Sequence, residues 1–239
     1  MTLTNKQTAL ITGASSGIGK ATALAFAKAG VNVALVSRSA AKLAAVASAA
    51  QATGVTAKTY VVDLAQVEQV QAQIKAIALD CGSIDILVNC AGMAYIGTLG
   101  ETPLADWLKV IDINLTSVWQ CILGVLPSMR DRAGGTIINV ASIAGKQPFP
   151  EWGAYSVSKA GLIALSKTLA AEERANGIRV TAICPGAVNT ELWDTVESNF
   201  DRQSMLTPEI VAESIVHTAL LPQQAVIDEL TLMPSAGVL

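Results

Sequence analysis

Histidine, aromatic residues and charged residues are scarce in this chain of 239 residues. The sequence contains one histidine, His217, with 4% aromatic and 15% charged residues. A zinc cluster or a Ser–His–Asp hydrolase site would have to rest on that one histidine. We therefore expect no metal centre and no hydrolase site, with His217 on the surface or in a structural role.

Cysteine pairs, excess positive charge and long apolar runs are also missing. Cys81, Cys90, Cys121 and Cys184 are scattered without a C-x-x-C pair, so reduced thiols are expected. The net charge of −3 and the pI near 5.2 argue against binding to nucleic acid. No uninterrupted run of about 18 apolar residues predicts a transmembrane helix, so no membrane partner is expected. Because residues 1–6 lack the apolar region of a signal peptide, we expect a cytoplasmic protein.

What the chain does have is apolar sequence in a regular order. Short β-branched runs alternate with longer alanine-rich helical patterns, which predicts a parallel sheet covered on both faces. We expect one domain, residues 1–239, with a doubly wound seven-stranded parallel sheet of the Rossmann type. Strands are predicted near 7–12, 31–37, 56–62, 84–89, 136–141, 178–184 and 226–232. Helices are predicted near 17–29, 40–52, 66–80, 103–131 (as two pieces), 153–175 and 208–221.

A glycine-rich turn follows the first predicted strand. The sequence Thr12-Gly13-x-x-x-Gly17-x-Gly19 leads directly into a helical pattern. In a strand–turn–helix unit, glycines let the backbone approach a pyrophosphate, and the helix N-terminus offers free N–H groups. A glycine turn without any nucleotide is the alternative at this point.

Tyr155 and Lys159 lie four residues apart in a predicted helix and so share one face. A nearby ammonium favours phenolate over phenol, which predicts that the pKa of Tyr155 falls towards neutrality. Such a phenol could exchange a proton with a substrate oxygen. Taken alone, the pair is more typical of a solvated helix face.

Further polar residues and glycines follow the ends of other predicted strands. Ligands of doubly wound sheets bind at the carboxyl ends of strands, so these residues should share one rim. They are Asp63, Asn89-Cys90-Ala91-Gly92, Ser142 and Pro185-Gly186, with Asn114 on the helix before the fifth strand. The long piece 185–207 carries Trp193, Phe200 and Met205, which either cover an apolar substrate or fill a local cluster.

Together these motifs resemble those of the short-chain dehydrogenase/reductase family, over nearly the whole chain. The resemblance implies that Tyr155 is the general acid in carbonyl reduction and that Lys159 lowers the pKa of its phenol and binds the nicotinamide ribose. It implies that Ser142 orients the substrate carbonyl and that Asn114 anchors a water linked to Lys159. Cys90 replaces the second asparagine usual in the family, and we treat it as tolerated.

The cofactor implied is NADP(H). An NAD enzyme would place an acidic residue at the end of the second strand, where this chain has Ser37 followed by Arg38, a residue suited to a phosphate. Lys42 is a weaker phosphate candidate. The predicted cofactor residues are Gly13, Ser15, Ser16, Gly17, Ile18, Gly19, Ser37, Arg38, Asp63, Leu64, Asn89, Ala91, Gly92, Tyr155, Lys159, Pro185, Gly186, Val188 and Thr190.

The substrate is expected to be a small carbonyl compound in a mostly apolar pocket. The predicted substrate residues are Ser142, Ala144, Gln147, Trp152, Tyr155, Ala187 and Trp193, with Met93, Tyr95 and Phe149 as further candidates. A 3-oxoacyl thioester reductase is the enzymatic alternative, although the ending Ile227–Pro234 lacks the Asp-Gly-Gly turn of many acyl reductases. A protein that senses NADP(H) without turnover is the non-enzymatic alternative. Family resemblance and a hydrophobic content of 51% suggest a homotetramer or dimer pairing the helices near 103–131 and 153–175.

Overall fold

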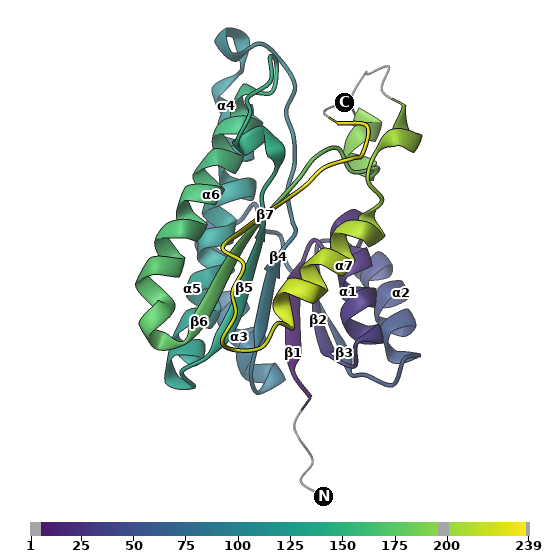
Figure 1. The fold of residues 1–239 in the computed structure, drawn as a ribbon, viewed down its shortest axis with the longest axis vertical. Coiled ribbons are helices and arrows are strands. Elements are labelled where there is room, and N and C mark those ends of the chain that lie inside the picture. The colour runs from purple at the N-terminus through teal and green to yellow at the C-terminus, as the bar shows by residue number, and fades with distance from the viewer. Residues whose placement is uncertain (1–5, 196–200, 238–239) are drawn as a thin grey trace, which may run out of the picture.

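The computed structural model describes residues 6–195 and 201–237, whose strands form one parallel sheet in the order β3-β2-β1-β4-β5-β6-β7 (Figure 1). The strands are β1 (Thr8–Thr12), β2 (Asn32–Ser37), β3 (Ala57–Val61), β4 (Ile86–Asn89), β5 (Gly135–Val140), β6 (Ile178–Pro185) and β7 (Glu229–Leu232). The helices are α1 (Gly17–Lys28), α2 (Ala40–Gln51), α3 (Val67–Cys81), α4 (Leu104–Ile111), α5 (Ser117–Asp131), α6 (Gly153–Glu173) and α7 (Pro208–Ala219). The predicted doubly wound parallel sheet is confirmed. Its strand order reverses between β1 and β4, where such folds bind ligands.

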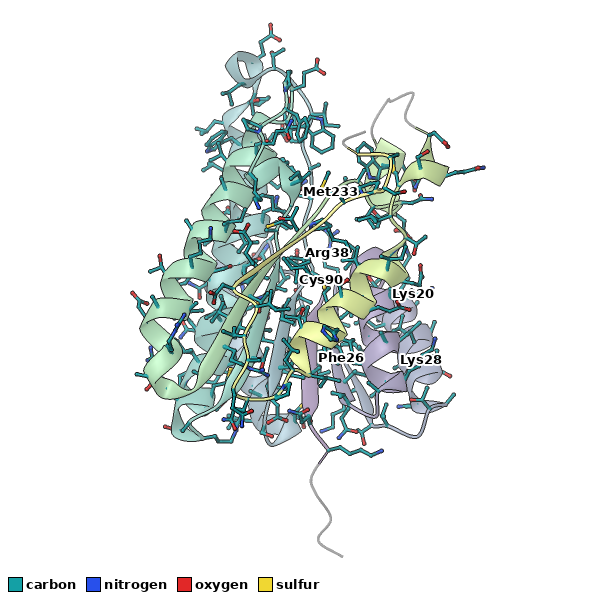
Figure 2. The ribbon with its side chains drawn as sticks, viewed as in Figure 1. Lys20, Phe26, Lys28, Arg38, Cys90 and Met233 are labelled. Carbon is teal, nitrogen blue, oxygen red and sulfur yellow. The ribbon has the colours of Figure 1, made fainter. Side chains whose placement is uncertain are left out.

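Two hydrophobic cores lie on opposite faces of the sheet. Helices α1, α2 and α7 cover one face, and α3, α5 and α6 cover the other (Figure 1). Helix α1 has one buried and one exposed face, as is typical of a surface helix. Phe26 is fully buried, while Lys20 and Lys28 remain exposed (Figure 2). Burial of the sheet on both faces accounts for much of the high apolar content.

The last strand is shorter than predicted. It begins at Glu229 and not near 226, because the preceding residues curl around the guanidinium of Arg179. Arg179 Nη1 donates to the carbonyls of Leu221 at 2.9 Å and Ala225 at 2.9 Å. Those carbonyls are thereby satisfied without sheet pairing.

The stretch predicted as two helical pieces contains α4 and α5, as predicted, although the two run on without a loop between them. Between α4 and α5 the chain passes through a π-helical turn, η2 (Asp112–Thr116), which includes Asn114. A π-turn inserts one residue without breaking the helix, and such turns are frequent at functional sites. Among the described residues, Leu104–Asp131 is the one helical stretch long and apolar enough to cross a membrane by length and composition. Half of its most apolar window is buried in the fold, as in the core helices of globular proteins.

The segment after β6 is held closed at its base and contains two short 3₁₀ helices, η5 (Glu191–Thr195) and η6 (Arg202–Ser204). The amide of Asn189 donates to the carbonyl of Leu206 at 2.8 Å, and the Leu206 amide donates to Ala187 at 2.9 Å. Of the three apolar residues predicted to cover a substrate here, Met205 is buried and Phe200 lies outside the described residues. Trp193 remains as the candidate.

Candidate active site

The glycine turn joins the ends of β1 and β4. Thr12 Oγ1 accepts hydrogen bonds from the amides of Cys90 at 3.2 Å and Ala91 at 3.3 Å. Gly13 has φ +66°, and a Cβ there would lie 2.9 Å from the Ala91 backbone. A Cβ at Gly19 would overlap the Gly13 carbonyl. Glycine is therefore required for a turn this tight, as the sequence predicts.

The turn leaves the N-terminus of α1 open to a ligand. Ser16 occupies the N-cap position but makes no side-chain cap, so the first N–H groups of α1 have no side-chain partner within the described part of the chain. Ser15, Ser16 and Ile18 are partly exposed beside them. A Cβ at Gly17 would lie 3.2 Å from Thr190 Cγ2, which places the segment after β6 against the turn. These residues fit a pyrophosphate.

Arg38 stands at the end of β2, next to this turn in the sheet. The Ser37 hydroxyl is buried and accepts from the amide of Ser39 at 3.2 Å. Arg38 is exposed and has no side-chain partner among the residues that the structure describes (labelled in Figure 2). Lys42, the weaker candidate, pairs instead with Glu191 at 3.3 Å. Of these two candidates, Arg38 is thus the one without a partner among the described residues.

Asp63 and Leu64 follow β3 along the same rim. The Asp63 carboxylate accepts from the amide of Ala65 at 3.1 Å, which leaves its second oxygen available for a ligand. Leu64 is buried in the core. Its side chain therefore supports the rim and faces away from solvent.

The side chains of Tyr155, Ser142 and Lys159 meet beyond the end of β5. Ser142 opens the 3₁₀ turn η3 (Ile143–Gly145), and its hydroxyl lies close enough to the phenol to hydrogen-bond with it. Lys159 Nζ lies 5.7 Å from the centroid of the Tyr155 ring. A Cβ at Gly145 would lie 2.7 Å from the Lys159 carbonyl carbon, so glycine permits this close approach of η3 to α6. The structure thus brings three of the predicted catalytic residues together.

The predicted fall in the pKa of Tyr155 is wrong for the protein itself. Burial raises the pKa of the Tyr155 phenol, and its hydrogen bond with Ser142 opposes that rise only in part. Lys159 does not contribute to the shift in the pKa of Tyr155, and its Nζ donates to the carbonyl of Val140 at 2.8 Å. Burial also lowers the pKa of Lys159 to about 8. Desolvation therefore outweighs charge attraction at this pair.

Asn114 holds the segment that follows β4. Its Nδ2 donates to the Met93 carbonyl at 2.8 Å and to Ser158 Oγ at 2.9 Å, and its Oδ1 accepts from the Met93 amide at 2.9 Å. The side chain is fully buried. Its predicted role in anchoring a water linked to Lys159 stays a prediction.

Asn89 lies inside the sheet. Its Nδ2 donates to Asn139 Oδ1 at 2.9 Å, and Asn139 donates onward to Ser166 at 2.9 Å. Asn89 is 1% exposed, so its side chain braces β4 from within the sheet, and its predicted contact with the cofactor stays a prediction. Gly92 is exposed, and the position of its missing Cβ lies 3.5 Å from Lys159 Nζ. Gly92 therefore borders Lys159.

Two tryptophans form the apolar side of the site. The Trp152 ring lies 5.5 Å from the Tyr155 ring, edge to face, and 5.7 Å from the Trp193 ring. Ala187 is partly exposed beside β6, while Gln147 is exposed. Ala144 is buried, and its amide donates to Ser142 Oγ at 3.1 Å. The aromatic pair therefore forms the wall, and Ala144 supports Ser142 from behind.

The other predicted residues complete the rim. Pro185 ends β6, and a Cβ at Gly186 would lie 2.8 Å from Pro234 Cδ, so the C-terminal segment packs closely there. Val188 is buried, and Thr190 contacts the glycine turn. Met93, Tyr95 and Phe149 are all partly exposed.

Several supporting groups gave no signal in the sequence. They are the Val140 carbonyl, Ser158, Glu191 and Arg202. Each acts through a contact with a residue distant in the chain or through its backbone, which no local motif marks. The four cysteines are free thiols, as predicted, and His217 is exposed on α7.

Comparison with known proteins agrees with this geometry. The model of the short chain dehydrogenase family matches residues 7–201. A glycine betaine reductase of Emericella nidulans is 33% identical over 234 residues, but the chain spans only 18% of that protein's length and 95% of its own. A 3-oxoacyl-[acyl-carrier-protein] reductase of Synechocystis is 38% identical over 199 residues, which is 83% of this chain and 81% of that protein.

The crystal structure of a variant of actinorhodin polyketide ketoreductase with NADPH is also similar. It has a TM-score of 0.88 and 31% sequence identity, with 99% of each chain covered. Fold, motifs and family match lead to one conclusion. The chain belongs to the short-chain dehydrogenase/reductase family.

Proposed function

We propose that this protein is an NADPH-dependent oxidoreductase that reduces a ketone to an alcohol. The observation that carries the proposal is the convergence of Tyr155, Ser142 and Lys159 on one rim with an open glycine turn. Membership of an oxidoreductase family supports the reaction class. The aromatic wall of Trp152 and Trp193 favours a carbonyl with an apolar substituent.

The residues divide the chemistry between them. Tyr155 donates its proton to the carbonyl oxygen, and its raised pKa keeps the phenol protonated at neutral pH, as a general acid requires. Ser142 donates a hydrogen bond to the same oxygen and stabilises the negative charge that develops there. Lys159 holds a positive charge near the phenolate that remains. NADPH supplies the hydride when bound.

Selection of NADPH is assigned to Arg38. Its free guanidinium suits a 2′-phosphate, and neighbouring Ser37 presents no carboxylate to repel one. The NADPH-bound ketoreductase of similar structure supports this choice. Titration of NADPH and NADH into wild type and Arg38→Ala should show NADPH affinity falling about tenfold with NADH affinity unchanged. An equal fall for both cofactors, or none, would remove Arg38 from this role.

A 3-oxoacyl thioester reductase is the second candidate, supported by the Synechocystis relative. A panel holding a β-keto thioester, a β-keto ester, a diketone and an aryl ketone separates the candidates. Turnover of the thioester alone favours the acyl reductase, and turnover of simple ketones favours the carbonyl reductase. Tight NADPH binding without turnover of any member supports the sensing protein and contradicts both reductases.

We also propose a homo-oligomer, a tetramer or a dimer. Exposed apolar side chains follow α4, α5 and α6, namely Leu104 at 71%, Leu108 at 48%, Trp119 at 46% and Val157 at 47% exposed. A surface of this kind on a soluble protein is typical of an interface. Light scattering at micromolar concentration tests the proposal, and a monodisperse monomer would contradict it.

A further inference from the structure

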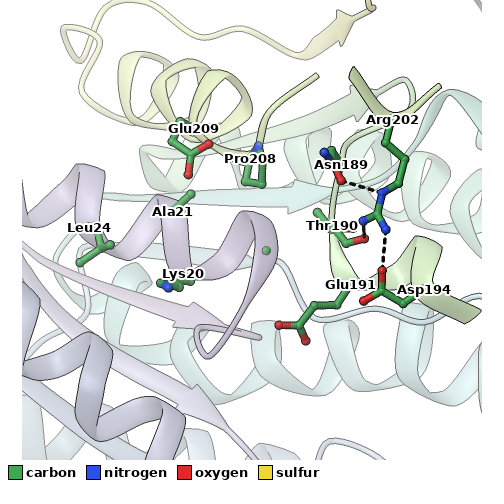
Figure 3. Close-up of a pocket in the computed structure, with 11 residues that line it drawn as sticks. Lys20, Ala21, Leu24, Asn189, Thr190, Glu191, Asp194, Arg202, Pro208 and Glu209 are labelled. Carbon is green, nitrogen blue, oxygen red and sulfur yellow. Dashed lines mark hydrogen bonds and ion pairs between the residues drawn. The ribbon is translucent and has the colours of Figure 1, made fainter. Parts of the chain in front are cut away.

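One arginine, Arg202, fastens the two arms of the segment after β6. Its Nε donates to Asn189 Oδ1 at 2.8 Å, its Nη1 to Asp194 Oδ1 at 2.6 Å and its Nη2 to the Thr190 carbonyl at 2.8 Å (Figure 3). All three acceptors belong to the arm 189–194. The donor lies on η6, on the opposite arm.

The geometry of these bonds fixes an orientation as well as a distance. A guanidinium is planar, and its N–H donors point in fixed directions. Three acceptors that satisfy three different nitrogens therefore hold η5 in one position relative to η6. Asp194 and Arg202 are 57% and 42% exposed, so the arrangement depends on the hydrogen-bond fork more than on charge attraction alone.

The element held in this way carries one wall of the proposed active site. Trp193 lies within η5, with its ring 5.7 Å from that of Trp152. Trp152 in turn lies 5.5 Å from the Tyr155 ring. A continuous path of contacts thus runs from Arg202 through η5 to the catalytic phenol.

The same arm borders the cofactor side. Thr190, whose carbonyl Arg202 binds, contacts the glycine turn at Gly17. Gly17, Thr190, Asp194 and Arg202 also line a cavity of about 290 Å³ between α1 and this segment (Figure 3). Lys42 reaches the arm from α2 through Glu191.

The base of the segment does not depend on Arg202. The backbone bonds between Leu206 and residues 187 and 189 close it whatever side chain stands at 202. Loss of Arg202 should therefore remove the bonds that orient η5 towards η6 without unfolding the protein. This makes the residue separable from the fold in an experiment.

We propose that Arg202 is a positioning residue that holds Trp193 against Trp152 and thereby sets the size of the substituent that the site accepts. The proposal rests on the proposed function for its substrate side and on the contacts alone for its positioning side. It predicts preference for carbonyl substrates with a bulky apolar substituent that packs against this aromatic wall. Removal of Arg202 should weaken binding of such substrates and leave small ketones unaffected.

The positioning side is tested by the exciton couplet that two adjacent tryptophans give in far-ultraviolet circular dichroism. Trp193→Phe calibrates the signal, because it keeps an aromatic ring and removes the pair. Arg202→Ala should lose most of the couplet while keeping a cooperative melt. Arg202→Lys should recover only part of it, since one ammonium cannot reach three acceptors. A full couplet in Arg202→Ala overturns the inference.

The substrate side is tested by steady-state kinetics with NADPH, an aryl ketone and a small aliphatic ketone. Arg202→Ala should raise KM about fivefold or more for the aryl ketone, with kcat and the KM of the small ketone changed less than about twofold. Arg174→Ala is the matched control, since Arg174 also pairs with one exposed carboxylate, at 3.8 Å. An unchanged KM for the aryl ketone overturns the specificity role. If wild type turns over neither ketone, the proposed function fails, and the couplet alone still decides the positioning role.

Discussion

Asn114→Ala is expected to destabilise the protein by about 3 kcal/mol, through hydrogen bonds that only the buried amide can supply. Asn114 is fully buried in the π-turn, and its amide bonds the Met93 N–H, the Met93 carbonyl and Ser158 Oγ. Ser158 keeps a second bond, in which its hydroxyl donates to the Tyr155 carbonyl at 2.7 Å. Two backbone groups of Met93 therefore lose their partners, at roughly 1–3 kcal/mol each.

Urea unfolding at one fixed protein concentration measures this loss as a shift in the midpoint at constant m-value. The midpoint temperature of thermal unfolding should fall by about 6–12 °C, because 1 kcal/mol shifts it by roughly 2–4 °C in a chain of this size. Asn176→Ala is the matched control, because its Nδ2 makes one bond, to Glu173 at 2.8 Å. Glu173 keeps its bond from Arg130 in that variant, so about 1 kcal/mol is expected. If Asn114→Ala costs no more than Asn176→Ala, the reasoning about Met93 is refuted.

The glycine turn at Gly19 and the buried ammonium of Lys159 can each be tested. Gly19→Ala should weaken NADPH binding at least about tenfold and lower the free energy of unfolding by about 1–3 kcal/mol, because the new Cβ overlaps the Gly13 carbonyl. Titration with NADPH tests this, and unchanged binding would contradict the tight turn. The kcat/KM for reduction should fall above about pH 8, where Lys159 loses its proton, since burial lowers its pKa to about 8; a profile flat to about pH 10 would contradict a buried lysine. Between about pH 8 and the ordinary lysine pKa of 10.5, the folded protein binds fewer protons than the unfolded chain. Its stability should therefore rise with pH across that range.

Much of the fold could be predicted because parallel strands buried on both faces give continuous apolar runs. Runs such as the one that forms β5 have no other stable placement in a chain of alternating helices and strands. The rim followed from the same logic, since the carboxyl ends of parallel strands must share one edge. The roles of Gly13 and Gly19 could be predicted because a tight turn leaves no room for a Cβ.

The departures arise where the outcome depends on three-dimensional surroundings. The sequence places Lys159 one turn from Tyr155, but Lys159 Nζ donates its hydrogen bond to the Val140 carbonyl, and burial controls both pKa values. Asn89 occupies a motif position, yet its side chain points into the sheet towards Asn139. Arg202 gave no signal at all, because its partners form only when two loop arms meet.

We propose that Tyr155 donates the proton in carbonyl reduction. Pre-steady-state oxidation of NADPH by wild type and Tyr155→Phe, with the best substrate of the carbonyl panel, tests it most directly. Tyr60→Phe is the control, because that phenol bonds Asp80 on the other side of the sheet from α1. We expect the rate of NADPH oxidation to fall about a hundredfold or more in Tyr155→Phe, while its affinity for NADPH changes only slightly. Tyr60→Phe should remain fully active. Turnover in Tyr155→Phe equal to that of Tyr60→Phe would contradict it.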